Sequence, residues 1–163
     1  MSRLLCALAL SAGLAGAALA QQADIRFGGL TQDTTLPVEV DADTLSVDQA
    51  KGTAVFSGNV MVRQGEMRLT AGMVEVEYSE DGSGIERMHA TGGVTLVSPT
   101  DAAESSEAVY TIDSGNVVMT GNVLLTQGSS AISGQKLTVD LKQGTGTMSG
   151  RVKTVFTPGG KTP

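Results

Sequence analysis

Apolar and polar residues alternate along most of this chain, in short runs separated by glycine-rich turns. The segments 56–65 (FSGNVMVRQG) and 119–128 (MTGNVLLTQG) are closely related, and weaker copies lie at 90–96 and 148–154. Because successive side chains of a strand point to opposite faces, each run would gather Val, Leu and Met on one face and polar residues on the other. No run has the spacing of an ordinary amphipathic helix.

The related segments place a glycine at Gly58, Gly92, Gly121 and Gly150, at intervals of 34, 29 and 29 residues. A repeat of this length is typical of one supersecondary unit used several times, with each unit covering its neighbour's apolar face. Gly58 lies inside the strand pattern of 53–64 and indicates a bulge or bend there. The pattern therefore predicts an all-β domain of short strands, which could form a sandwich, a roll or a barrel-like solenoid.

The first 20 residues have the features of a secretory signal peptide. Arg3 supplies a positive start, an apolar run of Leu and Ala follows, and 18–20 (ALA) has the small residues of a cleavage site. An uncleaved membrane anchor is the alternative, although the run is short for a span. We expect cleavage before Gln21, a flexible lead-in at 21–35, a folded domain at 36–156 and a flexible tail at 157–163.

Charge and candidate chemistry exclude several functions. The formal net charge is -6 and the basic residues do not cluster, so we expect no nucleic-acid partner. His89 is the only histidine, and we interpret it as structural or exposed. Asp41, Asp43 and Asp48 could offer oxygen ligands to Ca²⁺, but the remaining features of a calcium loop are missing and a solvated strand face is the favoured interpretation. We expect no metal, no cofactor and no catalytic residues.

The chain contains few aromatic residues, so medium-sized aliphatic side chains must line the inside of the predicted domain. Such an interior could be an ordinary packed core, or it could open to hold acyl chains. The residues alone leave both interiors possible.

The segment 36–40 (LPVEV), followed by 56–65 and by 117–123 (VVMTGNV), resembles the OstA-like family of periplasmic lipopolysaccharide-transport proteins. The resemblance extends over about 36–156. It implies a twisted antiparallel β-jellyroll built from repeated strand pairs, a periplasmic location and no enzymatic activity. The implied function is a bridge that carries lipopolysaccharide from the inner to the outer membrane. A secreted β-repeat protein with a structural or carbohydrate-active role is the alternative.

The resemblance also implies sites for lipid and for partners. The lipid A portion would contact inward-facing residues, which are Val38, Val40, Phe56, Val60, Val62, Leu96, Tyr110, Ile112, Val123 and Leu125. Edge strands would join copies head to tail, and would join the chain to related domains of LptC and LptD. The edge residues are Val38, Glu39 and Val40 at one end and Val152, Thr154 and Phe156 at the other. Unpaired edges present free N–H and C=O groups that pair readily with another chain.

Overall fold

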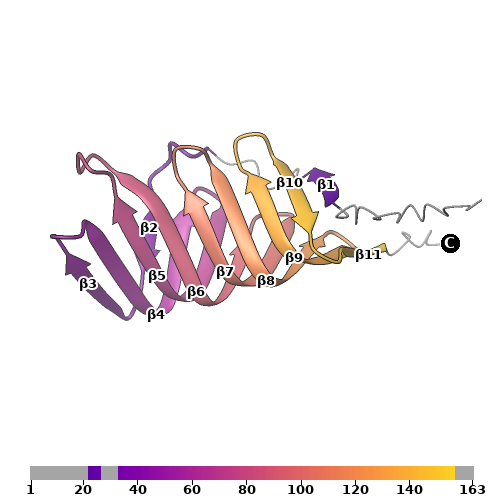
Figure 1. The fold of residues 1–163 in the computed structure, drawn as a ribbon, viewed down its shortest axis with the longest axis horizontal. Coiled ribbons are helices and arrows are strands. Elements are labelled where there is room, and N and C mark those ends of the chain that lie inside the picture. The colour runs from indigo at the N-terminus through magenta and orange to yellow at the C-terminus, as the bar shows by residue number, and fades with distance from the viewer. Residues whose placement is uncertain (1–21, 27–32, 157–163) are drawn as a thin grey trace, which may run out of the picture.

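The computed structural model describes residues 22–26 and 33–156 (Figure 1). The regular structure of these residues is β-strand, which confirms the predicted all-β class, and they include no helix long and apolar enough to cross a membrane. The strands in chain order are β1 (Gln22–Arg26), β2 (Glu39–Asp41), β3 (Thr44–Asp48), β4 (Thr53–Gln64), β5 (Met67–Tyr78), β6 (Ile85–Val97), β7 (Asp101–Thr111), β8 (Asn116–Gln127), β9 (Ser130–Asp140), β10 (Thr145–Ser149) and β11 (Lys153–Phe156).

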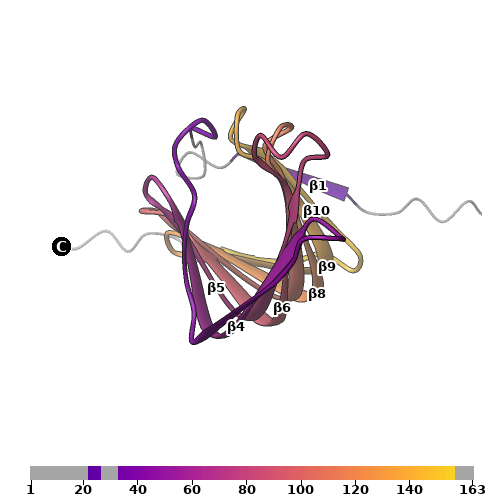
Figure 2. The same cartoon turned by 90° about the vertical axis from the view of Figure 1, so that its left-hand side faces the viewer.

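The strands form one antiparallel sheet that is folded over along its length (Figure 2). Each long strand from β4 to β9 bends once, and its pairing is interrupted at the bend. The two halves of these strands make two arms that enclose the interior. Arm A has the order β3-β4-β5-β6-β7-β8-β9-β10-β1, and arm B has the order β2-β4-β5-β6-β7-β8-β9-β11.

The bends of β4, β6 and β8 lie at the glycines that the repeat singled out, and Gly150 marks the same corner between β10 and β11. Gly58, Gly92, Gly121 and Gly150 have φ values of 79°, 82°, 84° and 82°. Glycine adopts this left-handed region without the steric cost that a Cβ brings. The bend predicted at Gly58 is confirmed, and the glycines of the other three copies lie at equivalent corners.

The corners also pack closely against the corners of neighbouring strands. A Cβ on Gly121 would lie 2.6 Å from the Oγ of Ser106, and that hydroxyl donates a hydrogen bond to the Gly121 carbonyl at 3.2 Å. A Cβ on Gly92 would lie 3.2 Å from the Cα of Gly72 on β5. The repeat unit is therefore a pair of bent strands whose corners touch.

The core lies between the two arms and is one continuous cluster of aliphatic residues. The fully buried members occupy the inward positions of both arms, for example Val74 and Met119 in arm A and Val60 and Leu125 in arm B. The alternation seen in the sequence therefore sorts the side chains as predicted, because the bends of β4 to β9 keep an apolar residue on the inner face on either side of each corner.

One expectation about the N-terminal region is wrong. The lead-in at 21–35 was expected to lack regular structure, but β1 pairs along β10 from Gln22 opposite Ser149 to Arg26 opposite Thr145. A strand of five residues shows little periodicity of its own, and its partner lies more than a hundred residues away in sequence. The signal peptide at 1–20 and the tail at 157–163 lie outside the described residues.

Candidate functional site

The structure brings all ten predicted inward residues into one interior. Six of them are 3% exposed or less: Val60, Val62, Leu96, Tyr110, Val123 and Leu125. The half-buried remainder packs against the same cluster: Val38, Val40, Phe56 and Ile112. They come from both arms, so a molecule held here would be contacted from two sides. Contact with lipid stays a prediction for each of them.

The middle of this interior is filled by protein side chains. Leu96 and Val123 are 1% exposed, and Leu125 is completely buried. The sequence left open whether the interior is a packed core or is open to acyl chains. In the middle of the roll it is a packed core. Acyl chains could therefore enter only where the arms separate or where the interior is already open.

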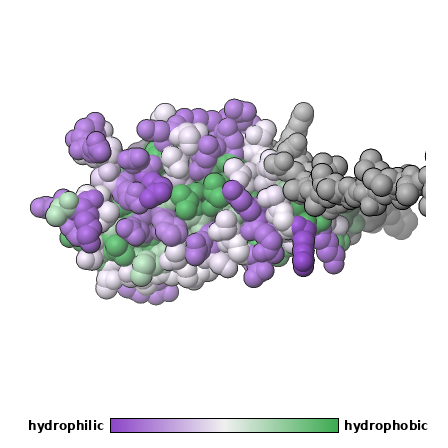
Figure 3. Space-filling model, viewed as in Figure 1, coloured by the Kyte–Doolittle hydropathy of each residue, from purple (hydrophilic) through white to green (hydrophobic). Residues whose placement is uncertain are grey.

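The interior is open at its two ends. On β3, Leu45 and Val47 are 56% and 59% exposed although their partners on β4, Phe56 and Ala54, lie on the inner face. Phe156, at the end of β11, is 72% exposed. Apolar patches also interrupt the polar surface in the space-filling view (Figure 3). The apolar inner face thus continues past the strands that cover it.

A hydrogen bond joins the arms on the side opposite the corners, which we call the mouth. Tyr110, near the end of β7 in arm A, donates its hydroxyl to Oε1 of Gln64 at the end of β4 in arm B, at 2.9 Å. The Nε2 of Gln64 in turn donates to the carbonyls of Thr34 at 3.2 Å and Leu36 at 2.9 Å. Gln64 is 1% exposed, so its amide supplies the hydrogen bonds that water would otherwise make to the Tyr110 hydroxyl and the two carbonyls.

Burial raises the pKa of Tyr110 to about 12. The phenol therefore stays protonated and remains a hydrogen-bond donor at physiological pH. Tyr110 lies on the inner face, as the alternation predicts, whereas Gln64 was not among the predicted inward residues. An inward-facing glutamine just before the turn at Gly65 was the available signal.

The acidic residues near the start of the domain do not form a metal site. Asp41 pairs with Nη1 of Arg63 at 2.6 Å, and Asp43 accepts a hydrogen bond from Nδ2 of Asn59 at 2.8 Å. Asp48 is engaged in a separate turn. No group of three acidic, histidine or cysteine side chains within 22–26 and 33–156 is arranged to hold a metal ion.

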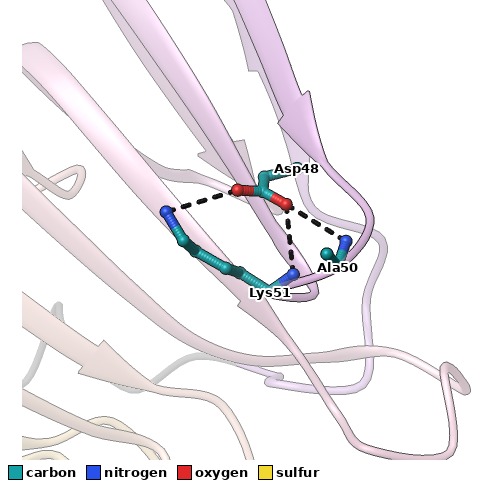
Figure 4. A network of polar contacts seen from close by, with 3 residues as sticks. All are labelled: Asp48, Ala50 and Lys51. Carbon is teal, nitrogen blue, oxygen red and sulfur yellow. Dashed lines mark hydrogen bonds and ion pairs between the residues drawn. The ribbon is translucent and has the colours of Figure 1, made fainter.

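Asp48 stabilises the turn between β3 and β4 (Figure 4). Its Oδ1 accepts from the backbone amides of Ala50 at 3.1 Å and Lys51 at 3.2 Å, and its Oδ2 lies 3.3 Å from the Lys51 ammonium. His89 lies on the outer face of arm A, 40% exposed and 3.6 Å from Glu107. These contacts account for both residues as parts of turns and strand faces.

The predicted assembly edges lie at opposite ends of arm B. Glu39 and Val40 belong to β2, and Thr154 and Phe156 belong to β11. Val38 and Val152 lie just before these strands and pack against the core. In the part of the chain that the structure describes, neither β2 nor β11 has a second strand on its outer side.

Comparisons with known proteins agree with this architecture. A family model described as "LptA/(LptD N-terminal domain) LPS transport protein" matches residues 39–145. The lipopolysaccharide export system protein LptA of Escherichia coli K12 is 32% identical over 142 residues, which cover 83% of this chain and 76% of LptA. An uncharacterized protein of Rhizobium meliloti is 30% identical over 139 residues, with 80% and 75% of the two chains covered.

A solved structure has the same fold. The crystal structure of LptH, the LptA homologous periplasmic component of the lipopolysaccharide transport device of Pseudomonas aeruginosa, matches with a TM-score of 0.71. The match covers 78% of this chain and 99% of LptH at 21% identity. At this identity the likeness bears on the fold, and it confirms the predicted antiparallel jellyroll.

Proposed function

Because the chain belongs to the family of lipopolysaccharide-transport proteins that includes LptA and the LptD N-terminal domain, we propose that it is a periplasmic bridge protein carrying lipopolysaccharide from the inner to the outer membrane. The observation that carries the proposal is the apolar inner face that runs through the roll and emerges at both ends. The signal peptide would direct the chain into the periplasm and be cleaved before Gln21. The protein would bind and pass on its cargo without a cofactor and without a chemical step.

The lipid A portion would lie between the arms, in contact with the ten inward residues. Each buried methylene of an acyl chain contributes roughly 0.8 kcal/mol, while the sugar and phosphate groups would stay in water at the mouth. Since the middle of the roll is packed, the acyl chains would enter by separating the arms. Similar apolar surroundings along the roll would let the lipid move without a deep trap.

Copies would associate head to tail through arm B, with β2 of one copy beside β11 of the next. An odd number of antiparallel steps separates β4 from β9, so β2 and β11 run in opposite directions and would meet as an antiparallel pair. Continuing the register of the neighbouring strands would place Val40 opposite Thr154 and Asp41 opposite Lys153. The second pair joins opposite charges, which favours this register. The same edges would bind the related domains of LptC-like and LptD-like proteins.

Photocrosslinking from the inner face tests the lipid role. A photoreactive amino acid at the half-buried Phe56 is expected to crosslink lipopolysaccharide in Gram-negative cells, whereas the same group at Glu75, on the outer face of arm A, is not. Equal labelling at both positions would contradict a lipid path inside the roll. Capture of a polysaccharide at Phe56 instead would support the alternative role as a carbohydrate-active protein.

Light scattering over a concentration series tests the assembly. Successive amides of a strand point to opposite sides, so one of the two residues Thr154 and Val155 directs its amide away from β9. A proline at that position removes the outward donor of β11, whereas a proline at the other removes a donor to β9. The wild type is expected to grow in mass with concentration. One of the two proline variants should stay small while its circular dichroism matches the wild type. A wild type that remains monomeric at all concentrations would contradict head-to-tail association.

A further inference from the structure

The two arms do not end at the same place. At one end of the roll, β2 and β3 both pair with β4 and occupy a single strand position, one in each arm. At the other end, β10 and β11 both pair with β9 and again share one position. Strand β1 pairs with β10 one position further out, in arm A alone. Arm A therefore carries an extra strand that arm B lacks.

This extra strand lies where the next copy would have to bind. If β2 of a second copy pairs with β11, then β3 of that copy must stand beside β10, because β2 and β3 share one position. Strand β1 already occupies that place. If β1 stayed, the incoming β3 would have to lie one strand spacing, about 4.8 Å, further out than β2. It would also run parallel to β1, since both strands are oriented antiparallel to β10 and its equivalents.

We propose that β1 is a removable cover of the β10 edge, and that β3 of a second copy displaces it when two copies join. This inference rests on the proposed head-to-tail function and extends it, because it assigns arm A a joint of its own. The direction of the strands fits: β4 and β10 are separated by an even number of antiparallel steps, so β3 would pair antiparallel with β10 as it does with β4.

The side chains of β3 also suit this place. Continuing the register of β10 puts Leu45 of the incoming copy opposite Met148 and Val47 opposite Gly146. Leu45 and Val47 are more than half exposed in the single copy, whereas Met148 and Gly146 are buried on the inner face. Docking would thus cover the apolar residues that end the interior at β3 and make the two interiors continuous.

The exchange is close to balanced in hydrogen bonds. Strand β1 pairs with β10 over five residues, and β3 has five residues to offer in its place. Attached to the same chain, β1 acts at a high effective concentration. The incoming β3 reaches a comparable effective concentration at the β10 edge only after β2 of the same copy has paired with β11. Assembly would therefore occur in two steps, with arm B joining first and β1 leaving second.

A disulfide that holds β1 in place tests the proposal. Asp24 and Thr147 are direct register partners, and the Cα separation of such pairs, about 4.5–5.5 Å, suits a disulfide. The Asp24→Cys/Thr147→Cys protein should need at least about tenfold higher concentration to assemble when oxidised than when reduced. The Asp24→Ser/Thr147→Ser protein is the matched control and should assemble alike under both conditions.

A second pair of cysteines reports the proposed joint directly. The register places Ser46 of the incoming copy opposite Thr147. Within one copy these residues are seven strand spacings apart, about 34 Å, so Ser46→Cys/Thr147→Cys can crosslink only between copies. Oxidation should produce a ladder of covalent oligomers on a non-reducing gel. Ser46→Cys/Thr138→Cys, which moves one cysteine a strand further in to β9, should not.

The outcomes separate the two proposals. A wild type that never assembles would remove the head-to-tail function and this inference with it. A wild type that assembles, together with a locked protein that assembles equally well and no Ser46–Thr147 ladder, would overturn the displacement of β1 alone. In that case the joint would consist of arm B only.

Discussion

Replacing Tyr110 with phenylalanine tests whether the bond across the mouth ties the two arms together. The substitution keeps the aromatic ring and therefore the packing of the core, but it removes the hydroxyl that donates to Gln64 at 2.9 Å. Oε1 of Gln64 would remain in a side chain that is 1% exposed, without this donor. A buried acceptor that loses its partner costs about 1–3 kcal/mol, and we expect the free energy of unfolding to fall by that amount.

Tyr78→Phe is the matched control, since Tyr78 is the only other tyrosine and is 42% exposed. We expect that change to alter the free energy of unfolding by less than about 0.5 kcal/mol. Urea unfolding followed by circular dichroism measures both variants, and the slope of the transition shows whether the unfolding remains two-state. Equal effects of the two substitutions would refute the idea that the Tyr110 bond holds the arms.

The stability of Tyr110→Phe relative to the wild type should also depend on pH in the alkaline range. The pKa of Tyr110 is raised from 10.0 to about 12 by burial, so the unfolded chain releases this proton before the folded chain does. The corresponding stability is fully present below pH 10 and is lost as the pH rises through 12, up to about 3 kcal/mol. Tyr110→Phe lacks this loss. The stability difference between the wild type and the variant should therefore shrink between pH 10 and pH 12.

Two further predictions concern the inner face and the corners. Val60→Asp and Val123→Asp each bury a charge at a position that is 1% exposed, so each should lower the free energy of unfolding by several kcal/mol. Both should also reduce lipopolysaccharide binding in a pull-down assay, whereas Glu75→Lys on the outer face should change neither stability nor binding. Equal damage by all three would show that the faces are wrongly assigned. Gly121→Ala should cost at least about 1 kcal/mol more in thermal unfolding than Gly82→Ala. Both glycines have positive φ, but only the Cβ at 121 would meet another side chain; similar costs would mean that the corners are loosely packed.

The parts of this fold that follow from local sequence were predictable. Strand faces follow from alternation, which needs only neighbouring residues. The corner glycines can be recognised in the sequence because a left-handed backbone conformation excludes most other residues. The corners of β7 and β9 were not predicted. They lie near Ser106 and Gly134, without a shared motif, and depend on contact with the neighbouring strand.

The parts that depend on distant partners were not predictable. Gln64 and Tyr110 are 46 residues apart, and nothing near either one indicates that a bond joins the arms. The position of β1 depends on the free edge of β10, which exists only once the whole roll has formed. Both features lie where the function would require change, at the mouth and at the joint between copies.

The energies at the mouth bear on how lipid could enter a roll that is packed when empty. Breaking the bond between Tyr110 and Gln64 costs about 1–3 kcal/mol, and each acyl methylene that leaves water contributes about 0.8 kcal/mol. Roughly one to four methylenes would therefore offset the loss of the bond. Beyond that point the lipid replaces contacts between aliphatic side chains with similar contacts of its own, so the net gain per methylene falls. A lipid could open the arms by its own burial and still leave the protein, which is what a carrier without an energy source of its own requires.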